Sequence, residues 1–217
     1  SMYSRLPAFV FGFHGCDQTT KEAVLFGNEF LRPSKNNYDW LGSGIYFWEQ
    51  NYQRALEFAT LAKQNPGKYT SFPINNPAVL GAIIDLGNCL NLMDAFHINR
   101  LRLAHSYLEK VTNIAEVSLP HNRGFDPDKP LRILDRTVIE ALHLFIENNA
   151  GGQVIDENLG SESYDTVRGL FQEGDPVYKG AGFKAQTHIQ ICVRNINCIK
   201  GFFDPREKCS DPFGHLK

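Results

Sequence analysis

Hydrophobic positions near the N-terminus predict two short strands with a helix between them. Residues 8–14 are predicted to form a buried strand, because an apolar run continues up to His14-Gly15. Threonines can begin a short helix over residues 19–26, and Gly27 can end it. The turn-rich stretch "RPSKNNYD" then leads into "GIYFW" at residues 44–48, which predicts the second strand.

The middle of the chain carries the spacing of amphipathic helices. Apolar residues recur every three or four positions over residues 51–63, 98–115 and 134–145. Between the first two of these segments, a run of branched residues at 78–87 predicts another strand. The polar loop at residues 120–130 is too long for a minimal connection between helices, so we expect it to be functional or mobile.

The last third of the chain returns to strand-like segments joined by glycine-bearing links, at residues 164–171, 176–183, 187–193 and 198–203. Helices are therefore concentrated in the middle and strands at both ends. This distribution predicts an α+β fold with a largely antiparallel sheet. The length suits one domain spanning residues 1–217.

Composition narrows the class of protein. The chain is 42% apolar and 21% charged, as in ordinary globular proteins. Its net charge of −2 provides no overall electrostatic attraction for nucleic acid. No apolar run approaches the roughly 18 residues of a membrane helix, and the N-terminus lacks the pattern of a signal peptide. Five cysteines without a C-x-x-C pair favour a reducing compartment. We therefore expect a cytoplasmic protein with no membrane segment.

Several familiar motifs are absent or misplaced. Residues 180–185 read G-x-G-x-x-A, but a strand-like segment follows them where a dinucleotide site needs a helix, so we interpret the glycines as a turn. A phosphate-binding loop and a zinc deaminase signature are both missing. The His14/Cys16 and Cys192/Cys198 pairs have unsuitable spacing for a metal, so none is expected.

His14 and Cys16 also raise the question of a nucleophilic thiol. Residues two apart on a strand point to the same face, so an imidazole could activate the thiol. A small cysteine near the end of a strand is more often explained by packing.

Two motifs together carry a resemblance to a known family. His14-Gly15 ends the first predicted strand, and "GSGIYF" at residues 42–47 precedes the helix of residues 51–63. In this order, they resemble the diphtheria-toxin-like and poly(ADP-ribose) polymerase-like ADP-ribosyltransferases. The resemblance covers about residues 9–62, and a weaker similarity extends over residues 164–203. It implies a split antiparallel sheet with helices inserted between its strands, and NAD as a substrate.

The resemblance also implies roles for individual residues. His14 would hydrogen-bond the adenosine ribose of NAD, and backbone groups of Gly15 would hold the nicotinamide amide. Tyr46 would stack on the nicotinamide ring, while Ser43 and Gly44 would let the backbone approach closely. We then expect the side chains of His14 and Tyr46 to line one concave pocket. The alternative is a hydrogen-bonded core histidine with a buried tyrosine.

The third element of the family pattern is missing. These enzymes carry a glutamate at the start of a late strand, and the matching position here is Thr187. The resemblance therefore implies transfer of single ADP-ribose units rather than polymer growth. Glu173, in "LFQEGDPVY", is a candidate replacement or else an exposed turn residue. Glu140 is a further buried acid, expected to pair with Arg136 at a spacing of four.

The function expected from this resemblance is NAD-dependent mono-ADP-ribosyl transfer to a protein or nucleic-acid acceptor, as in bacterial toxins or phage-defence effectors. One alternative is a catalytically silent module that binds NAD or ADP-ribose. Another is an NAD-dependent RNA 2′-phosphotransferase, which would need basic residues such as Arg168, Lys179, Lys184 and Arg194 at the site. NAD cleavage to free ADP-ribose would instead indicate a glycohydrolase.

Overall fold

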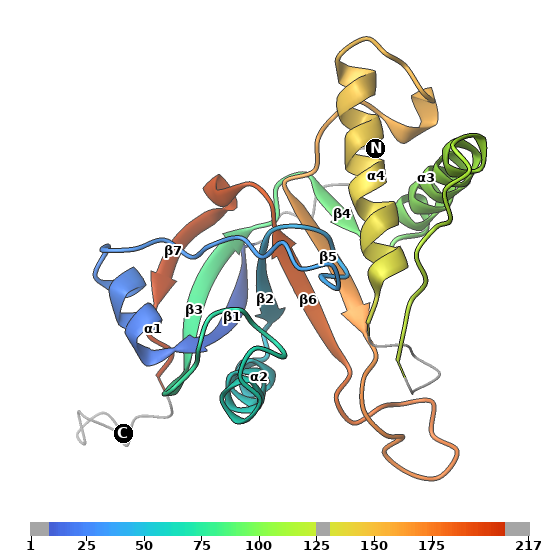
Figure 1. The fold of residues 1–217 in the computed structure, drawn as a ribbon. Helices are drawn as coiled ribbons and strands as arrows, with labels where there is room; N and C mark the ends of the chain where they lie inside the picture. The colour runs from blue at the N-terminus through green and yellow to red at the C-terminus, as the bar shows by residue number, and fades with distance from the viewer. Residues whose placement is uncertain (1–8, 125–130, 207–217) are drawn as a thin grey trace, which may run out of the picture.

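The computed structural model describes residues 9–124 and 131–206 of the chain. These residues form a mixed α+β fold around one seven-stranded sheet in the order β4-β5-β6-β2-β1-β3-β7 (Figure 1). Neighbouring strands are antiparallel except for β4 and β5. The predicted α+β class and largely antiparallel sheet are thus confirmed.

The strands are β1 Phe9–Asp17, β2 Ile45–Glu49, β3 Pro77–Asp85, β4 Cys89–Asn91, β5 Thr166–Phe171, β6 His188–Val193 and β7 Ile199–Phe203. The helices are α1 Gln18–Leu25, α2 Tyr52–Gln64, α3 Ala95–Ile114 and α4 Ile133–Ala150, with short 3-10 turns at Glu157–Leu159 and Ile196–Cys198. No helix among the described residues is long and apolar enough to cross a membrane.

The sheet is weakly joined between β1 and β2. These strands pair only at Gly12–Glu49 and Phe13–Trp48, whereas β1 follows β3 through nine residue pairs. β1 therefore leaves β2 after Phe13 and continues beside β3 to α1 (Figure 1). The pairing of β1 with β2 thus stops next to His14.

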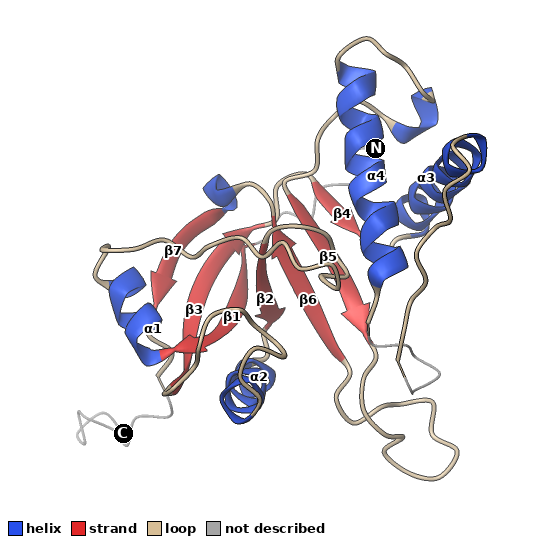
Figure 2. Cartoon of the chain, in the orientation of Figure 1, coloured by secondary structure: helices blue, strands red, loops and turns tan. Residues whose placement is uncertain are grey.

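Helices cover the two faces of the sheet unequally. One face packs against α1 through a core that includes Phe47 and Leu80. On the other face, α2 lies over β1 and β3, while α4, flanked by α3, lies over β5 and β6 (Figure 2). This face is lined by alternate strand residues, among them Trp48, Val167 and Cys192.

One predicted strand is wrong, and one strand was not predicted. Residues 176–183 form no strand but an irregular hairpin loop, in which Gly180 has a φ of +81°. This result confirms that the glycines there make a turn. The three-residue β4 was missed, because it is too short to show an alternating pattern.

The start of α1 also differs from the prediction. β1 continues to Asp17, whose carboxylate accepts a hydrogen bond from Thr19 N and so begins the helix in place of the threonines. Asp17 also accepts hydrogen bonds from Asn75 N and Asn76 N, and its pKa falls to about 2 because these hydrogen bonds outweigh its burial. In the loop of residues 120–130, positions 125–130 lie outside the described residues.

Candidate functional site

The two motifs of the resemblance meet through one hydrogen bond. His14 Nδ1 lies 2.8 Å from the backbone oxygen of Tyr46, at the point where β1 leaves β2. A carbonyl oxygen only accepts hydrogen bonds, so Nδ1 carries the proton and Nε2 keeps a lone pair. Burial lowers the pKa of His14, and the imidazole is therefore neutral at pH 7.

The side chains of His14 and Tyr46 nevertheless lie on opposite faces of the sheet. Phe13 is directly opposite Trp48, so these two residues share a face, and their neighbours alternate away from it. His14 contacts the ring of Phe47, with ring centroids 5.7 Å apart, whereas Tyr46 packs into the core beneath α4. The expectation that both side chains line one concave pocket was wrong.

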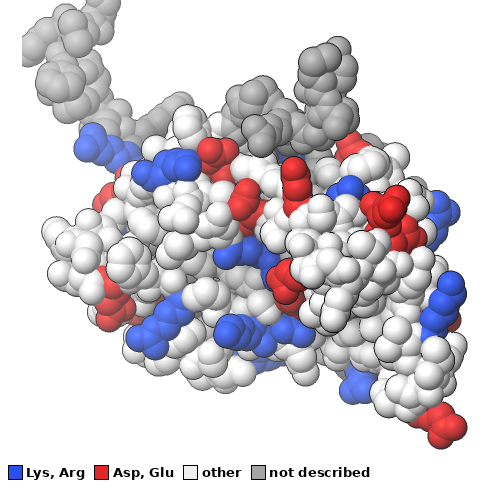
Figure 3. Space-filling model, turned by 90° about the horizontal axis from the view of Figure 1, so that it is seen from above, with Lys and Arg blue, Asp and Glu red and all other residues white. Residues whose placement is uncertain are grey.

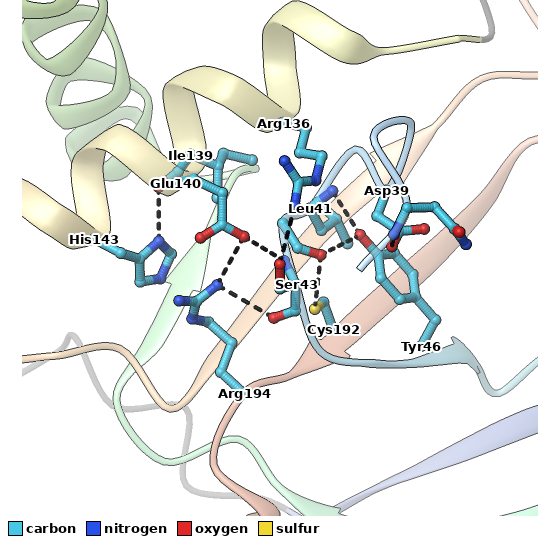
Figure 4. Close-up of polar contacts among 12 residues, drawn as sticks. Asp39, Leu41, Ser43, Tyr46, Arg136, Ile139, Glu140, His143, Cys192 and Arg194 are labelled. Atoms are coloured by element: carbon cyan, nitrogen blue, oxygen red, sulfur yellow. Dashed lines mark hydrogen bonds and ion pairs between the residues drawn. The ribbon is translucent and has the colours of Figure 1, made fainter. Parts of the chain in front are cut away.

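The Tyr46 hydroxyl is used inside the fold. It donates to Gly42 O at 2.8 Å and accepts from Leu41 N at 3.0 Å, so it holds the turn that precedes its own strand (Figure 4). Burial raises the pKa of Tyr46 well above its ordinary value. The tyrosine thus shapes the backbone that leads into β2.

Gly15 is needed for close packing against α2. A β-carbon at this position would overlap the carbonyl oxygen of Ala55, and the Phe58 ring lies beside it. Gly44 is constrained in a similar way, since a β-carbon there would lie 2.5 Å from Cys192 Sγ. The backbone does approach closely at both glycines, but the partners are elements of the fold.

Ser43 is held by charged side chains at all three of its polar atoms (Figure 4). Its backbone N–H donates to Glu140 Oε1, its hydroxyl accepts from Arg136 Nη2 at 3.2 Å, and its carbonyl accepts from Arg194 Nη1 at 3.2 Å. Glu140 and Arg194 also form an ion pair at 3.3 Å. The structure therefore pairs Glu140 with Arg194, whereas the predicted partner, Arg136, contacts Ser43.

The charge of Glu140 is stabilised by these contacts. Burial acts to raise its pKa, but the hydrogen bond from Ser43 N and the nearby Arg194 outweigh it, and the pKa lies below the ordinary value. Glu140 is an anion at neutral pH. No sequence pattern linked Arg194 to Glu140, because Arg194 lies beyond the end of β6 and 54 positions from Glu140.

Glu173 and Thr187 form a second group, away from Ser43. Glu173 Oε2 lies 2.7 Å from Arg54 Nη2 on α2, and Arg54 also contacts Glu57. Thr187 is exposed immediately before β6. Tyr46 pairs with Cys192, five residues further along, so Thr187 lies roughly 17 Å from that level of the sheet. The predicted site residues are thus divided between two ends of β2.

His188 and Trp48 line the sheet near this second group. His188 is 5% exposed, its Nδ1 bonds Gln186 O at 2.6 Å, and burial lowers its pKa to about 4. Its ring centroid lies 6.2 Å from that of Trp48. Within the described part of the chain, neither His188 Nε2 nor Trp48 Nε1 has a hydrogen-bond partner. No sequence motif marks either side chain as functional.

The structure weakens the interpretation of Cys16 as a nucleophile. Burial, with a smaller contribution from Asp17, raises the pKa of Cys16 to about 11, so its thiol is not an activated nucleophile. No group of three or more potential metal ligands occurs among residues 9–124 and 131–206.

The basic residues considered for RNA chemistry do not converge. Arg168 pairs with Glu49, and Arg194 with Glu140. Lys179 lies in the hairpin loop between β5 and β6. Seen from above, basic and acidic side chains are interspersed (Figure 3). This distribution gives no support to a 2′-phosphotransferase.

Comparisons with known proteins add one distant relative. The chain is 25% identical over 204 residues to MJ0359 of Methanocaldococcus jannaschii, which is described as an uncharacterized protein; the match covers 87% of this chain and 83% of the relative. No family model matches the chain, and no solved structure matches it significantly. The relative shares most of its length with this chain but supplies no function.

Proposed function

We propose that the protein is an NAD-dependent mono-ADP-ribosyltransferase acting on a protein or nucleic-acid acceptor. The observation that carries the proposal is the hydrogen bond between His14 Nδ1 and Tyr46 O at the point where β1 leaves β2. It joins the two motifs of the resemblance at one point of the sheet. The hydrogen bond places the proton on Nδ1, and burial keeps the imidazole neutral, so Nε2 has a lone pair suited to accept a hydrogen bond from a ribose hydroxyl.

Glu173 supplies the negative charge in this proposal. The N-glycosidic bond of NAD breaks, nicotinamide leaves with the bonding electrons, and positive charge develops on the ribose. A fixed carboxylate stabilises such charge. Residues 54 and 55 of α2 connect the two parts of the site, because Arg54 holds Glu173 and Ala55 abuts Gly15. The acceptor atom then bonds to the ribose carbon and releases its proton.

Transfer of single units follows from the residue at position 187. Thr187 has no carboxylate to activate a ribose hydroxyl for chain extension. The proposal therefore excludes polymer as a product.

A silent NAD- or ADP-ribose-binding module is the second candidate, and two observations favour it. α2 covers the side of Gly15 on which a β-carbon would point, and the Tyr46 hydroxyl is satisfied by the turn before β2. Both reduce the backbone and ring surface that a nicotinamide would need.

Incubation with NAD labelled in its adenylate half tests both candidates. The full chain is mixed with protein, DNA and RNA fractions, and the label and the free nicotinamide are followed. We expect label as single units in one fraction, accompanied by nicotinamide. A ladder of polymer, or free ADP-ribose as the only product, would contradict the proposal. NAD binding without nicotinamide release would favour the silent module.

A further inference from the structure

The turn at Gly42–Gly44 brings an unusual set of hydrogen-bond donors to one carboxylate oxygen. Glu140 Oε1 accepts hydrogen bonds from Ser43 N and Arg194 Nη1 (Figure 4). Arg136 Nη2 approaches from the other side and contacts the Ser43 hydroxyl at 3.2 Å. A backbone N–H and the Arg194 guanidinium therefore meet one carboxylate oxygen, and the Arg136 guanidinium lies on the hydroxyl of the same serine.

We propose that this turn, with Arg136 and Arg194, is a binding site for a phosphate-bearing ligand, and that the Glu140 carboxylate occupies it in this structure. In proteins, phosphate oxygens accept hydrogen bonds from guanidinium groups and backbone N–H groups. Glu140 supplies the same kind of anionic oxygen from within the chain.

The glycine at position 42 makes room for such an oxygen. Gly42 has a φ of +85°, and a β-carbon there would lie 2.9 Å from Glu140 Oε1 and 3.2 Å from Arg194 Nη1. A side chain at this position would fill the space that the carboxylate oxygen and the guanidinium share. The turn thus combines Gly42, whose backbone is in the left-handed conformation, with hydrogen-bond donors that converge on Glu140 Oε1.

Two other titratable side chains lie near the arginines. Asp39 is one: its carboxylate accepts a hydrogen bond from Asn36 N at 2.6 Å, and burial raises its pKa more than the nearby Arg136 lowers it. His143 is 5% exposed and lies beside Arg194 (Figure 4). Its Nδ1 bonds Ile139 O, and no described residue partners its Nε2. That lone pair can accept from a hydroxyl of the ligand.

Glu140 can leave the site without disturbing the core. Its side chain is 29% exposed, so a change of rotamer carries the carboxylate into solvent. Until it leaves, it competes with an external anion for the same donors. Removing the carboxylate should therefore strengthen the binding of phosphate.

Calorimetric titration of orthophosphate and pyrophosphate tests the site, using wild type, Glu140→Ala and Glu140→Gln. Because Glu140→Ala frees charge-assisted hydrogen-bond donors for the ligand, we expect this variant to bind pyrophosphate about tenfold more tightly or better. Adding Arg194→Gln to this variant should abolish the gain. Glu147→Ala removes an exposed carboxylate from the same helix and is the matched control. Equal affinities in Glu140→Ala and Glu147→Ala would overturn the proposal.

A measurement on the wild-type chain does not depend on whether the variants fold. Pyrophosphate should raise its Tm more than sodium chloride of the same ionic strength, and the absence of such a rise would also overturn the proposal. ADP-ribose in place of pyrophosphate tests whether the phosphate belongs to a nucleotide. The site does not depend on the proposed transferase: pyrophosphate binding without NAD turnover would refute the transferase alone.

Discussion

His14 depends on the backbone of its partner residue, and the Tyr46 side chain has a separate task. The imidazole bonds a carbonyl oxygen that any residue at position 46 would provide, while the phenol holds Leu41 and Gly42. The two side chains lie on opposite faces of the sheet. Substitutions at the two positions should therefore have different consequences.

His14→Ala should weaken NAD binding about tenfold or more, because the proposed hydrogen bond to the ribose is lost. Tyr46→Phe retains the ring and the carbonyl oxygen, so NAD binding should persist while the free energy of unfolding falls by about 1 kcal/mol. Calorimetry with NAD and urea unfolding measure these two effects. A folded Tyr46→Phe protein that binds NAD as poorly as His14→Ala would contradict this division of roles.

His188 should make stability depend on pH. Its pKa is about 4 in the folded protein because of burial, and the ordinary value is 6.5. The unfolded chain therefore binds a proton first as the pH falls, and stability is lost between pH 6.5 and about 4. The loss from this residue amounts to about 3 kcal/mol. Urea unfolding at several pH values should show a shallower dependence for His188→Phe, and an unchanged slope would rule this residue out as the cause.

At the scale of elements, Arg54 connects α2 to the hairpin loop between β5 and β6. The loop spans residues 172–187, and Glu173 near its start reaches Arg54 at 2.7 Å. Further along the loop, Gln186 N bonds Glu173 O. One ion pair thus ties the base of a long loop to a helix that also packs against Gly15.

Arg54→Gln should loosen this loop while leaving the sheet intact. Glu173 is more than one third exposed, so the ion pair contributes less than about 1 kcal/mol to global stability. Hydrogen exchange should nevertheless become faster across residues 172–187, and trypsin should cleave sooner after Lys179. Lys63→Gln, in the last turn of α2, is the matched control. Unchanged exchange in Arg54→Gln would show that the loop is held by its backbone bonds alone.

Glu173→Gln addresses the proposed catalytic charge. The amide retains the shape of the side chain and removes its charge, so turnover should fall on the order of a hundredfold while NAD affinity is nearly retained. Single-turnover release of nicotinamide measures the first quantity and calorimetry the second. Near-normal turnover would leave Glu173 a loop residue that serves Arg54.

In the molecule as a whole, strands from both ends of the chain form one sheet, and side chains are buried on both faces of this sheet. The described cysteines show this best, since all four are free and buried, and burial is the main cause that raises the pKa of each thiol: Cys16, Cys89, Cys192 and Cys198. Cys209 lies outside the described residues. The four thiols are shielded by the folded structure as a unit.

Their modification should therefore report global unfolding. A thiol reagent should label the four buried cysteines at the rate at which the protein unfolds, and labelling should rise with urea in step with the loss of circular dichroism. Peptide mass spectrometry separates these sites from Cys209. Rapid labelling of Cys192 in the native protein would contradict this prediction, because that thiol lies beneath α4.

The sequence alone determined the elements whose patterns are local. Alternation or continuous burial over five to nine residues predicted β1, β2 and β3, and three- and four-residue spacing predicted α2, α3 and α4. It also determined that His14-Gly15 and Tyr46 lie on separate strands. A period of two or 3.6 depends only on neighbouring residues, so it can be read without knowing the fold.

Only the tertiary structure determined which side chains lie next to one another. The register Phe13–Trp48 sets His14 and Tyr46 on opposite faces, and a shift of one residue would have brought them together. Ser43 meets Arg136, Glu140 and Arg194 across separations of 93, 97 and 151 residues. Contacts of this kind arise from strand pairing and helix packing over the whole sheet, and no local pattern in the chain encodes them.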